Sequence, residues 1–215
     1  MANPSIYNSL WRIHQGGSVP KDLSKLLFEK KELLATTFAN LIVQSLITFY
    51  ALKKYSTEKK NRSIAVWIGL FGVVILLSVI ALPIWFKFLL FCLFSYGWGY
   101  TLSDLASFDI LYNAWIGALS IFAIMFSLGV MMIVSGIRLG IKTAIVLFYS
   151  LLALILATLV TNKLSIVGIV LFSFYILYDT NRILQKNYYG DFITASLDYY
   201  LDILNIMTNL VNVDS

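Results

Sequence analysis

Charged side chains are scarce in this sequence. Only 13% of its 215 residues are charged and 60% are hydrophobic, whereas soluble domains carry about 25% charged residues. A soluble fold of this length has too little interior to hide so much apolar surface. The composition therefore excludes an ordinary soluble domain and predicts that the lipid bilayer is the solvent.

Cysteine and histidine are nearly absent. The single cysteine, Cys92, excludes a disulfide within the chain. The single histidine, His14, excludes a metal site built from histidines. The sequence contains no Walker loop, dinucleotide-binding fingerprint or Ser-His-Asp set. We therefore expect no bound cofactor and no enzymatic activity of the kinds found in soluble proteins.

Basic residues outnumber acidic ones but do not form a compact patch. The formal net charge is +5, and most lysines and arginines lie between apolar segments. Such a distribution is typical of membrane orientation signals or of contact with anionic lipid. It predicts the lipid bilayer as a partner and excludes nucleic acid.

Seven apolar runs follow a polar N-terminal segment. They are residues 33–52, 64–82, 86–103, 111–135, 141–160, 164–184 and 192–212. A helix needs about 17–25 residues to cross the hydrocarbon, and open sheet edges are not stable in lipid. The predicted fold class is therefore an all-α integral membrane protein with about seven transmembrane helices. It has a polar segment, 1–32, and one transmembrane domain, 33–212.

The basic residues also predict an orientation. With seven alternating crossings, the side that holds the N-terminus collects ten lysines and arginines, and the other side collects six. Because cytosolic loops are enriched in these residues, we expect the N-terminus and the polar segment 1–32 in the cytosol.

The last apolar run carries a polar stripe. At about 100° per residue, its polar residues share an arc of about 80°. They are Asp198, Asp202, Asn205, Asn209 and Asn212. A polar stripe on a helix in lipid must face other helices or water, so we expect the other six helices to surround this one. The alternatives are an interhelical hydrogen-bond seam without further function, or a last helix that lies in the membrane interface.

Two aspartates of the last quarter are candidates for an ion path. Ionisable residues inside a membrane are costly and are by default functional candidates. Asp179 ends the sixth apolar run, and Asp202 lies within the seventh. If the two carboxyl groups meet in a dry site, they share one proton and change charge with pH. Such a pair can gate a cation path, and carboxylate oxygens are ligands that calcium prefers.

Polar and small residues of the earlier spans suggest helix packing. Asn40 and Gln44 lie one turn apart in the first span, where they line the interior or form a packing contact. Gly97 and Gly99 bend the third span or allow close helix packing, and we favour packing.

The last quarter of the chain resembles the Bax inhibitor family, the transmembrane Bax-inhibitor-motif proteins. The resemblance rests on Tyr178-Asp179-Thr180 at the end of the sixth span, on Gly190-Asp191, and on the run from Ala195 to Asn205. It implies six helices around a central seventh. It also implies a pH-sensitive calcium leak across a membrane, and suppression of cell death with membrane protein partners.

The resemblance also assigns site residues. The pH-sensing aspartate pair of the family falls on Asp179 and Asp202, and Asp198 matches an aspartate that only some members carry. Asn205 and Asn209 are then pore-lining candidates, and the pair is a transient calcium contact. Bacterial relatives place an arginine near the end of the second span to latch onto the aspartates. Residues 80–87 contain no arginine, which makes Lys87 the candidate substitute.

Three functions follow as hypotheses. The first is a passive, pH-dependent calcium leak. The second is a regulator of cell death that does not conduct and acts through membrane protein partners. The third is an intramembrane aspartyl protease, for which Tyr178-Asp179 fits the first motif but residues 188–191 lack a glycine of the second. The expected membrane is the endoplasmic reticulum or Golgi for a eukaryotic or viral host, and the plasma membrane for a bacterium.

Overall fold

The computed structural model describes residues 23–56, 64–80, 82–158, 160–161, 164–185 and 191–214. This part of the chain forms seven helices and contains no strand. The helices are α2 (Leu23–Tyr55), α3 (Ile64–Val79), α4 (Ile84–Leu102), α5 (Phe108–Val134), α6 (Ile141–Thr158), α7 (Ser165–Gln185) and α8 (Phe192–Asp214). The predicted all-α fold is thus confirmed, and every predicted span coincides with one helix.

The first helix is longer than its predicted span. α2 begins at Leu23, ten residues before the predicted start at residue 33. Most residues of the added turns are leucine, lysine or glutamate, which favour helix. Leu26 within these turns is buried. Part of the predicted polar segment is therefore helical, and its residues 1–22 lie outside the described chain.

Four helices are long and apolar enough to cross a membrane: α2, α5, α6 and α7. Within α3, a shorter apolar stretch covers Val66–Ser78. α4 and α8 are interrupted by polar side chains, among them Lys87 in α4 and Asp202 in α8. These two helices depend on their neighbours for a polar environment, because lipid offers none.

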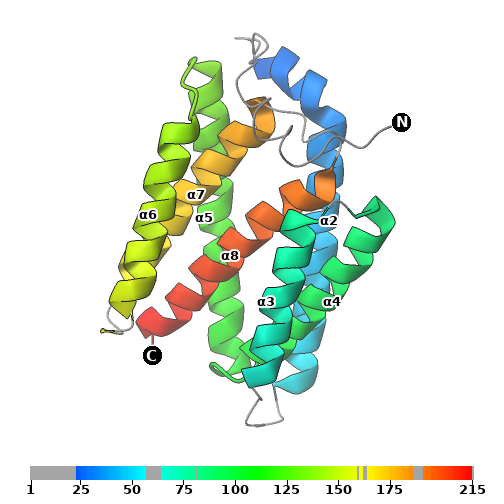
Figure 1. The fold of residues 1–215 in the computed structure, drawn as a ribbon, viewed down its shortest axis with the longest axis vertical. Helices are drawn as coiled ribbons and strands as arrows, with labels where there is room; N and C mark the ends of the chain where they lie inside the picture. The colour runs from blue at the N-terminus through cyan, green and yellow to red at the C-terminus, as the bar shows by residue number, and fades with distance from the viewer. Residues whose placement is uncertain are drawn as a thin grey trace.

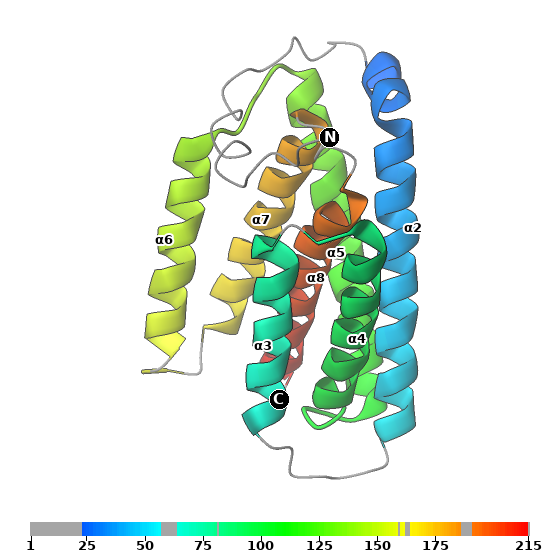
Figure 2. The same ribbon diagram turned by 45° about the vertical axis from the view of Figure 1, so that its right-hand side comes forward.

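Helix α8 runs through the middle of the bundle (Figures 1 and 2). Its main contacts are with α7, α5 and α2, and it also touches α4. α3 packs chiefly on α4, and α6 on α7. α8 thus has its main contacts with four of the six other described helices, and the expected arrangement of six helices around α8 stays a prediction.

The turns between helices follow local chemistry. Pro83 precedes α4 and ends the helical path from α3, because proline lacks a backbone donor. Gly136 ends α5 with a φ of 83°, a conformation that glycine adopts without strain. The amide of Ile137 then donates to the carbonyl of Met132 at 2.8 Å.

Candidate functional site

The polar ends of α7 and α8 meet at the interface between these two helices. α7 carries Asp179 and Arg182 near its C-terminal end, and α8 carries Asp198 and Asp202. Spacings of three and four residues place each pair on one face of its helix. We call these four residues the acidic cluster. Figure 2 shows α7 and α8 side by side in the bundle.

Asp179 and Asp202 form the buried part of the acidic cluster. They are only 7% and 5% exposed. Their carboxyl groups are close enough to interact electrostatically, and Asp202 Oδ2 is buried without a hydrogen-bond partner among the described residues. Two ionised carboxylates that lie close together in a buried site repel each other. The structure brings the two residues together, and their roles in pH sensing and ion passage stay predictions.

The outer part of the acidic cluster holds its only cation. The Arg182 guanidinium lies 3.5 Å from Asp198 Oδ2 and 4.0 Å from Asp179 Oδ1. The side chain of Arg182 is 38% exposed and that of Asp198 is 24% exposed, so this pair lies at the rim of the site. The sequence interpretation missed Arg182 as a site residue. The available signal was its position three residues after Asp179, on the same helical face.

Lys87 does not take the position of the missing arginine. Its ammonium donates to Asp191 Oδ2 at 2.5 Å and to Thr194 Oγ1 at 3.1 Å. Asp191 also accepts the backbone N–H of Thr194 at 3.0 Å, as a cap of the first turn of α8. The expectation that Lys87 replaces the latch is therefore wrong. Lys87 instead links the start of α4 to the start of α8 through these two contacts.

The asparagines of the polar stripe lie along α8 beyond the acidic cluster. The Asn205 amide donates to the carbonyl of Leu201 at 2.8 Å, and the Asn209 amide donates to that of Asn205 at 2.7 Å. A β-carbon at Gly168 of α7 would come within 2.4 Å of Asn209 Oδ1, so the helices are in close contact there. Asn205 and Asn209 are half-buried, Asn209 lies against α7, and the pore-lining role of both stays a prediction.

A second polar interface joins α8 to α2 and α4 on the other side. Asn40 Nδ2 donates to Ser196 Oγ at 2.5 Å, and Gln44 Nε2 donates to Asn40 Oδ1 at 3.0 Å. Ser95 Oγ donates to Gln44 Oε1 at 2.9 Å, and a hydrogen bond joins Tyr200 to Thr48. These groups are neutral and buried. Asn40 and Gln44 therefore form a packing contact, one of the two interpretations of their spacing.

The described residues contain no group of three or more histidine, cysteine, aspartate or glutamate side chains placed to hold a metal ion. Calcium takes six to eight oxygen ligands in a stable site. The arrangement therefore offers carboxylate oxygens for a passing ion, and the transient calcium contact at Asp179 and Asp202 stays a prediction.

Comparisons with known proteins identify the family. Residues 30–213 match the family described as Inhibitor of apoptosis-promoting Bax1. An uncharacterized protein of Campylobacter jejuni is 38% identical over 81 residues, which cover 37% of this chain and 35% of that protein. Protein LIFEGUARD 1 of Arabidopsis thaliana is 33% identical over 73 residues, which cover 33% of this chain and 31% of that protein.

The matched stretches span about a third of the length of these two curated relatives. The family match, by contrast, covers most of the chain and all seven described helices in whole or in part. Four of those helices are long and apolar enough to span a bilayer. The chain is therefore an integral membrane protein that belongs to the Bax inhibitor family.

Proposed function

We propose that this protein is a pH-dependent calcium leak pathway controlled by the acidic cluster. The observation that carries the proposal is the pair of neighbouring carboxyl groups of Asp179 and Asp202, buried between α7 and α8. In this proposal the shared proton holds the two helices together. Its loss is the event that changes the path.

Electrostatics supports this role of the proton. When it leaves, two negative charges face each other in a site with little water. Two unit charges about 4 Å apart repel each other by about 4 kcal/mol when the effective dielectric constant is about 20. Interhelical hydrogen bonds in membranes contribute only about 0.6 kcal/mol on average. Repulsion of this size is enough to alter the packing of α7 against α8.

The polar stripe supports a path for a cation. From Asp198 to Asn209 the stripe covers eleven residue steps, or about 16 Å of helix. That length is about half of the hydrocarbon thickness of a bilayer, which is about 30 Å. The stripe offers carboxylate and amide oxygens, which suit calcium. Because Asn209 packs against Gly168, ion passage requires α7 to move away from α8.

The test is calcium flux into proteoliposomes across pH 5 to 8. In Asp202→Asn the neutral amide imitates the protonated acid and can still donate a hydrogen bond, but it cannot release a proton and become negatively charged. We expect this variant to keep the acid-side flux of the wild type at every pH. Asp109→Asn, at an exposed aspartate in the first turn of α5, is the matched control. A wild-type pH response in Asp202→Asn would rule out the proposed sensor.

A second candidate function is a regulator that suppresses cell death without conduction. The observation that favours it is the description of the matched family, Inhibitor of apoptosis-promoting Bax1. In this function, membrane protein partners bind outside the acidic cluster. Protection of stressed cells would then survive Asp202→Asn, and deletion of residues 1–22, which lie before α2, tests whether the N-terminal segment docks the partner.

The proposal includes no enzymatic activity. The protease pattern pairs Asp179 with Asp191, but Asp191 bonds Lys87 and caps α8. Cleavage of a helical substrate that stops in Asp179→Ala would contradict this part. The proposed location is the endoplasmic reticulum or Golgi of a eukaryotic host, or the plasma membrane of a bacterium, and fractionation of host membranes tests it.

A further inference from the structure

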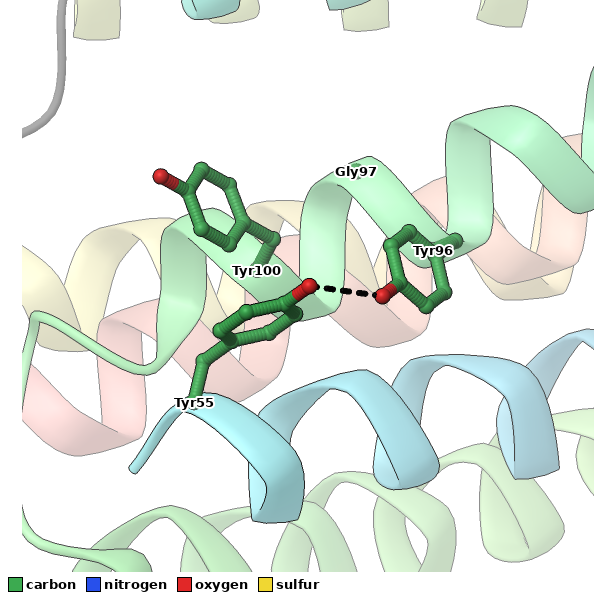
Figure 3. A pocket seen from close by; sticks show the side chains of 4 residues that line it. All are labelled: Tyr55, Tyr96, Gly97 and Tyr100. Atoms are coloured by element: carbon green, nitrogen blue, oxygen red, sulfur yellow. Dashed lines mark hydrogen bonds between the residues drawn. The ribbon is translucent and has the colours of Figure 1, made fainter. Parts of the chain in front are cut away.

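A pocket of about 380 Å³ opens between the C-terminal part of α2 and the second half of α4. Its lining is formed by Tyr55, Tyr96, Gly97 and Tyr100, and we call it the tyrosine pocket (Figure 3). The hydroxyl groups of Tyr55 and Tyr96 are 2.8 Å apart. The rings of Tyr55 and Tyr100 meet edge to face, with centroids 4.8 Å apart. The walls are thus held in place by contacts among the tyrosines themselves.

The rim of the tyrosine pocket carries a positive charge. The Lys54 ammonium lies 3.5 Å from the hydroxyl of Tyr96 and 5.3 Å from the ring centroid of Tyr55. Lys53 precedes it in the exposed last turn of α2. An ammonium group is a donor only, and tyrosine hydroxyls donate to strong acceptors. The complementary group is an anionic oxygen, such as a phosphate oxygen.

The tyrosine pocket is continuous with the surface that faces lipid. Tyr96 and Tyr100 share a face of α4 with Leu89 and Leu93, because the four residues are spaced by four, three and four positions. Leu89 and Leu93 are 55% and 60% exposed. An acyl chain can lie along these leucines while its headgroup reaches the pocket. This continuity favours an occupant that arrives from the bilayer over one that arrives from water.

Helix α3 packs against α4 beside the tyrosine pocket. A β-carbon at Gly97 would lie 2.6 Å from Leu70 Cδ2, so α3 and α4 touch at the pocket. The rings of Trp67 and Trp98 meet edge to face in the same contact between α3 and α4, with centroids 5.3 Å apart. Tryptophan and tyrosine at span ends are typical of the depth at which lipid headgroups lie. The pocket is therefore at the height of a phosphate group when the protein is in a bilayer.

From these observations we propose that the tyrosine pocket binds the phosphate group of a phospholipid, whose acyl chain lies along the exposed leucines of α4. Tyr96 and Lys54 supply the hydrogen bonds to the phosphate oxygens. This site is separate from the acidic cluster, and the proposal does not depend on calcium conduction.

The test is native mass spectrometry of the full chain in detergent. The protein is titrated with phosphatidylglycerol and, separately, with a diacylglycerol of the same acyl chains, which lacks the phosphate. We expect phosphatidylglycerol to be retained and the diacylglycerol to be lost. Loss of one hydrogen bond to a charged group corresponds to about a tenfold weaker binding, expected for Tyr96→Phe and for Lys54→Gln.

The matched control is Tyr149→Phe, at an exposed tyrosine of α6 that does not line the pocket. Equal retention of diacylglycerol, or wild-type binding by both pocket variants, would overturn the proposal. Displacement of the lipid by millimolar inorganic phosphate would show that the site takes a soluble anion and would overturn the lipid assignment. If Tyr96→Phe unfolds, Lys54→Gln decides alone, because its exposed side chain leaves the bond between Tyr55 and Tyr96 intact.

Discussion

Arg182 brings a positive charge to the two residues of the acidic cluster that it touches. It lies on α7, three residues after Asp179, and reaches across to Asp198 on α8. A cation at this position favours the charged form of nearby carboxyl groups, because it offsets their desolvation. Arg182 therefore links the two helices, and in the proposed mechanism it sets how readily the buried pair loses its proton.

Removal of this charge should move the pH response of calcium flux. In Arg182→Gln we expect the midpoint of the response to shift by about one pH unit toward higher pH, because the carboxyl groups then hold their protons longer. Arg182→Lys keeps the charge and should restore most of the wild-type midpoint. Arg138→Gln, at an exposed arginine after α5, is the control. An unchanged midpoint in Arg182→Gln would exclude this role.

The ion pair between Lys87 and Asp191 is a second contact whose contribution to the free energy of unfolding can be measured. The side chain of Lys87 is 10% exposed and that of Asp191 is 27% exposed. Removing one partner leaves the other half-buried charge without compensation. We expect Lys87→Gln to lower the free energy of unfolding by about 1–3 kcal/mol.

A double-mutant cycle measures this coupling. Lys87→Gln combined with Asp191→Asn should cost less than the sum of the two single changes, because the charges are removed together. Thermal unfolding in detergent is the readout, and Lys142→Gln, at an exposed lysine, is the control. Additive effects would mean that the pair contributes nothing to stability beyond its separate contacts.

At the scale of the helices, glycine decides how closely two of them approach. A β-carbon at Gly99 of α4 would come within 2.2 Å of the backbone carbonyl oxygen of Thr48 in α2. Backbone cannot move aside as a flexible side chain can. The sequence predicted close packing at Gly97 and Gly99, and for Gly99 the structure identifies the partner as α2.

Substitution of alanine at two glycines separates packing from helix propensity. We expect Gly99→Ala to destabilise the protein by about 1–3 kcal/mol, because the helices must move apart. Gly69→Ala in α3, where no atom lies within 4 Å of the added carbon, should be neutral or stabilising by up to about 1 kcal/mol. Thermal unfolding of both variants is the measurement. Equal effects at the two positions would show that the approach of α4 to α2 is not limiting.

The helices themselves follow from the sequence to a large extent. Apolar runs bounded by charges or by Pro83 predicted all seven helices, because lipid requires every buried backbone group to be bonded within its helix. The start of α2 was predicted too late, since hydropathy does not report helix that continues into polar turns. Arg182 and the pair of Lys87 with Asp191 were missed or misassigned for another reason. Arg182 reaches Asp198, and Lys87 reaches Asp191, across helix boundaries, and one sequence does not specify which helices are neighbours.

At the scale of the whole molecule, the two sides of α8 differ in chemistry. Toward α2 and α4 it forms neutral hydrogen bonds, such as that between Asn40 and Ser196. Toward α7 it presents the acidic cluster. The neutral contacts contain no group that ionises near neutral pH, whereas the proposed leak mechanism assigns a pH-dependent proton to the acidic cluster. A change of pH should therefore move α7 relative to a fixed unit of α2, α4 and α8.

Distances between spin labels measured by double electron–electron resonance test this division. The labels are placed at Phe174 in α7, Val213 in α8 and Leu46 in α2, which are all exposed, in a background that carries Cys92→Ser. Between pH 5 and pH 8 we expect the distance from Phe174 to Leu46 to change, and the distance from Val213 to Leu46 to stay constant. A constant distance in both pairs, or a change in the second pair alone, would contradict the proposed motion.

The polar residues of α8 also govern how the protein is made. An aspartate at the centre of a helix costs about 2.5–3.5 kcal/mol on insertion into lipid, and α8 carries Asp198, Asp202 and three asparagines. The translocon therefore has little drive to release α8 into lipid by itself. Several of its polar side chains have partners on α2, α4 and α7, which are synthesised earlier. We therefore expect α8 to insert after α2, α4 and α7 are in the membrane, and errors in those helices should leave its polar groups exposed to lipid.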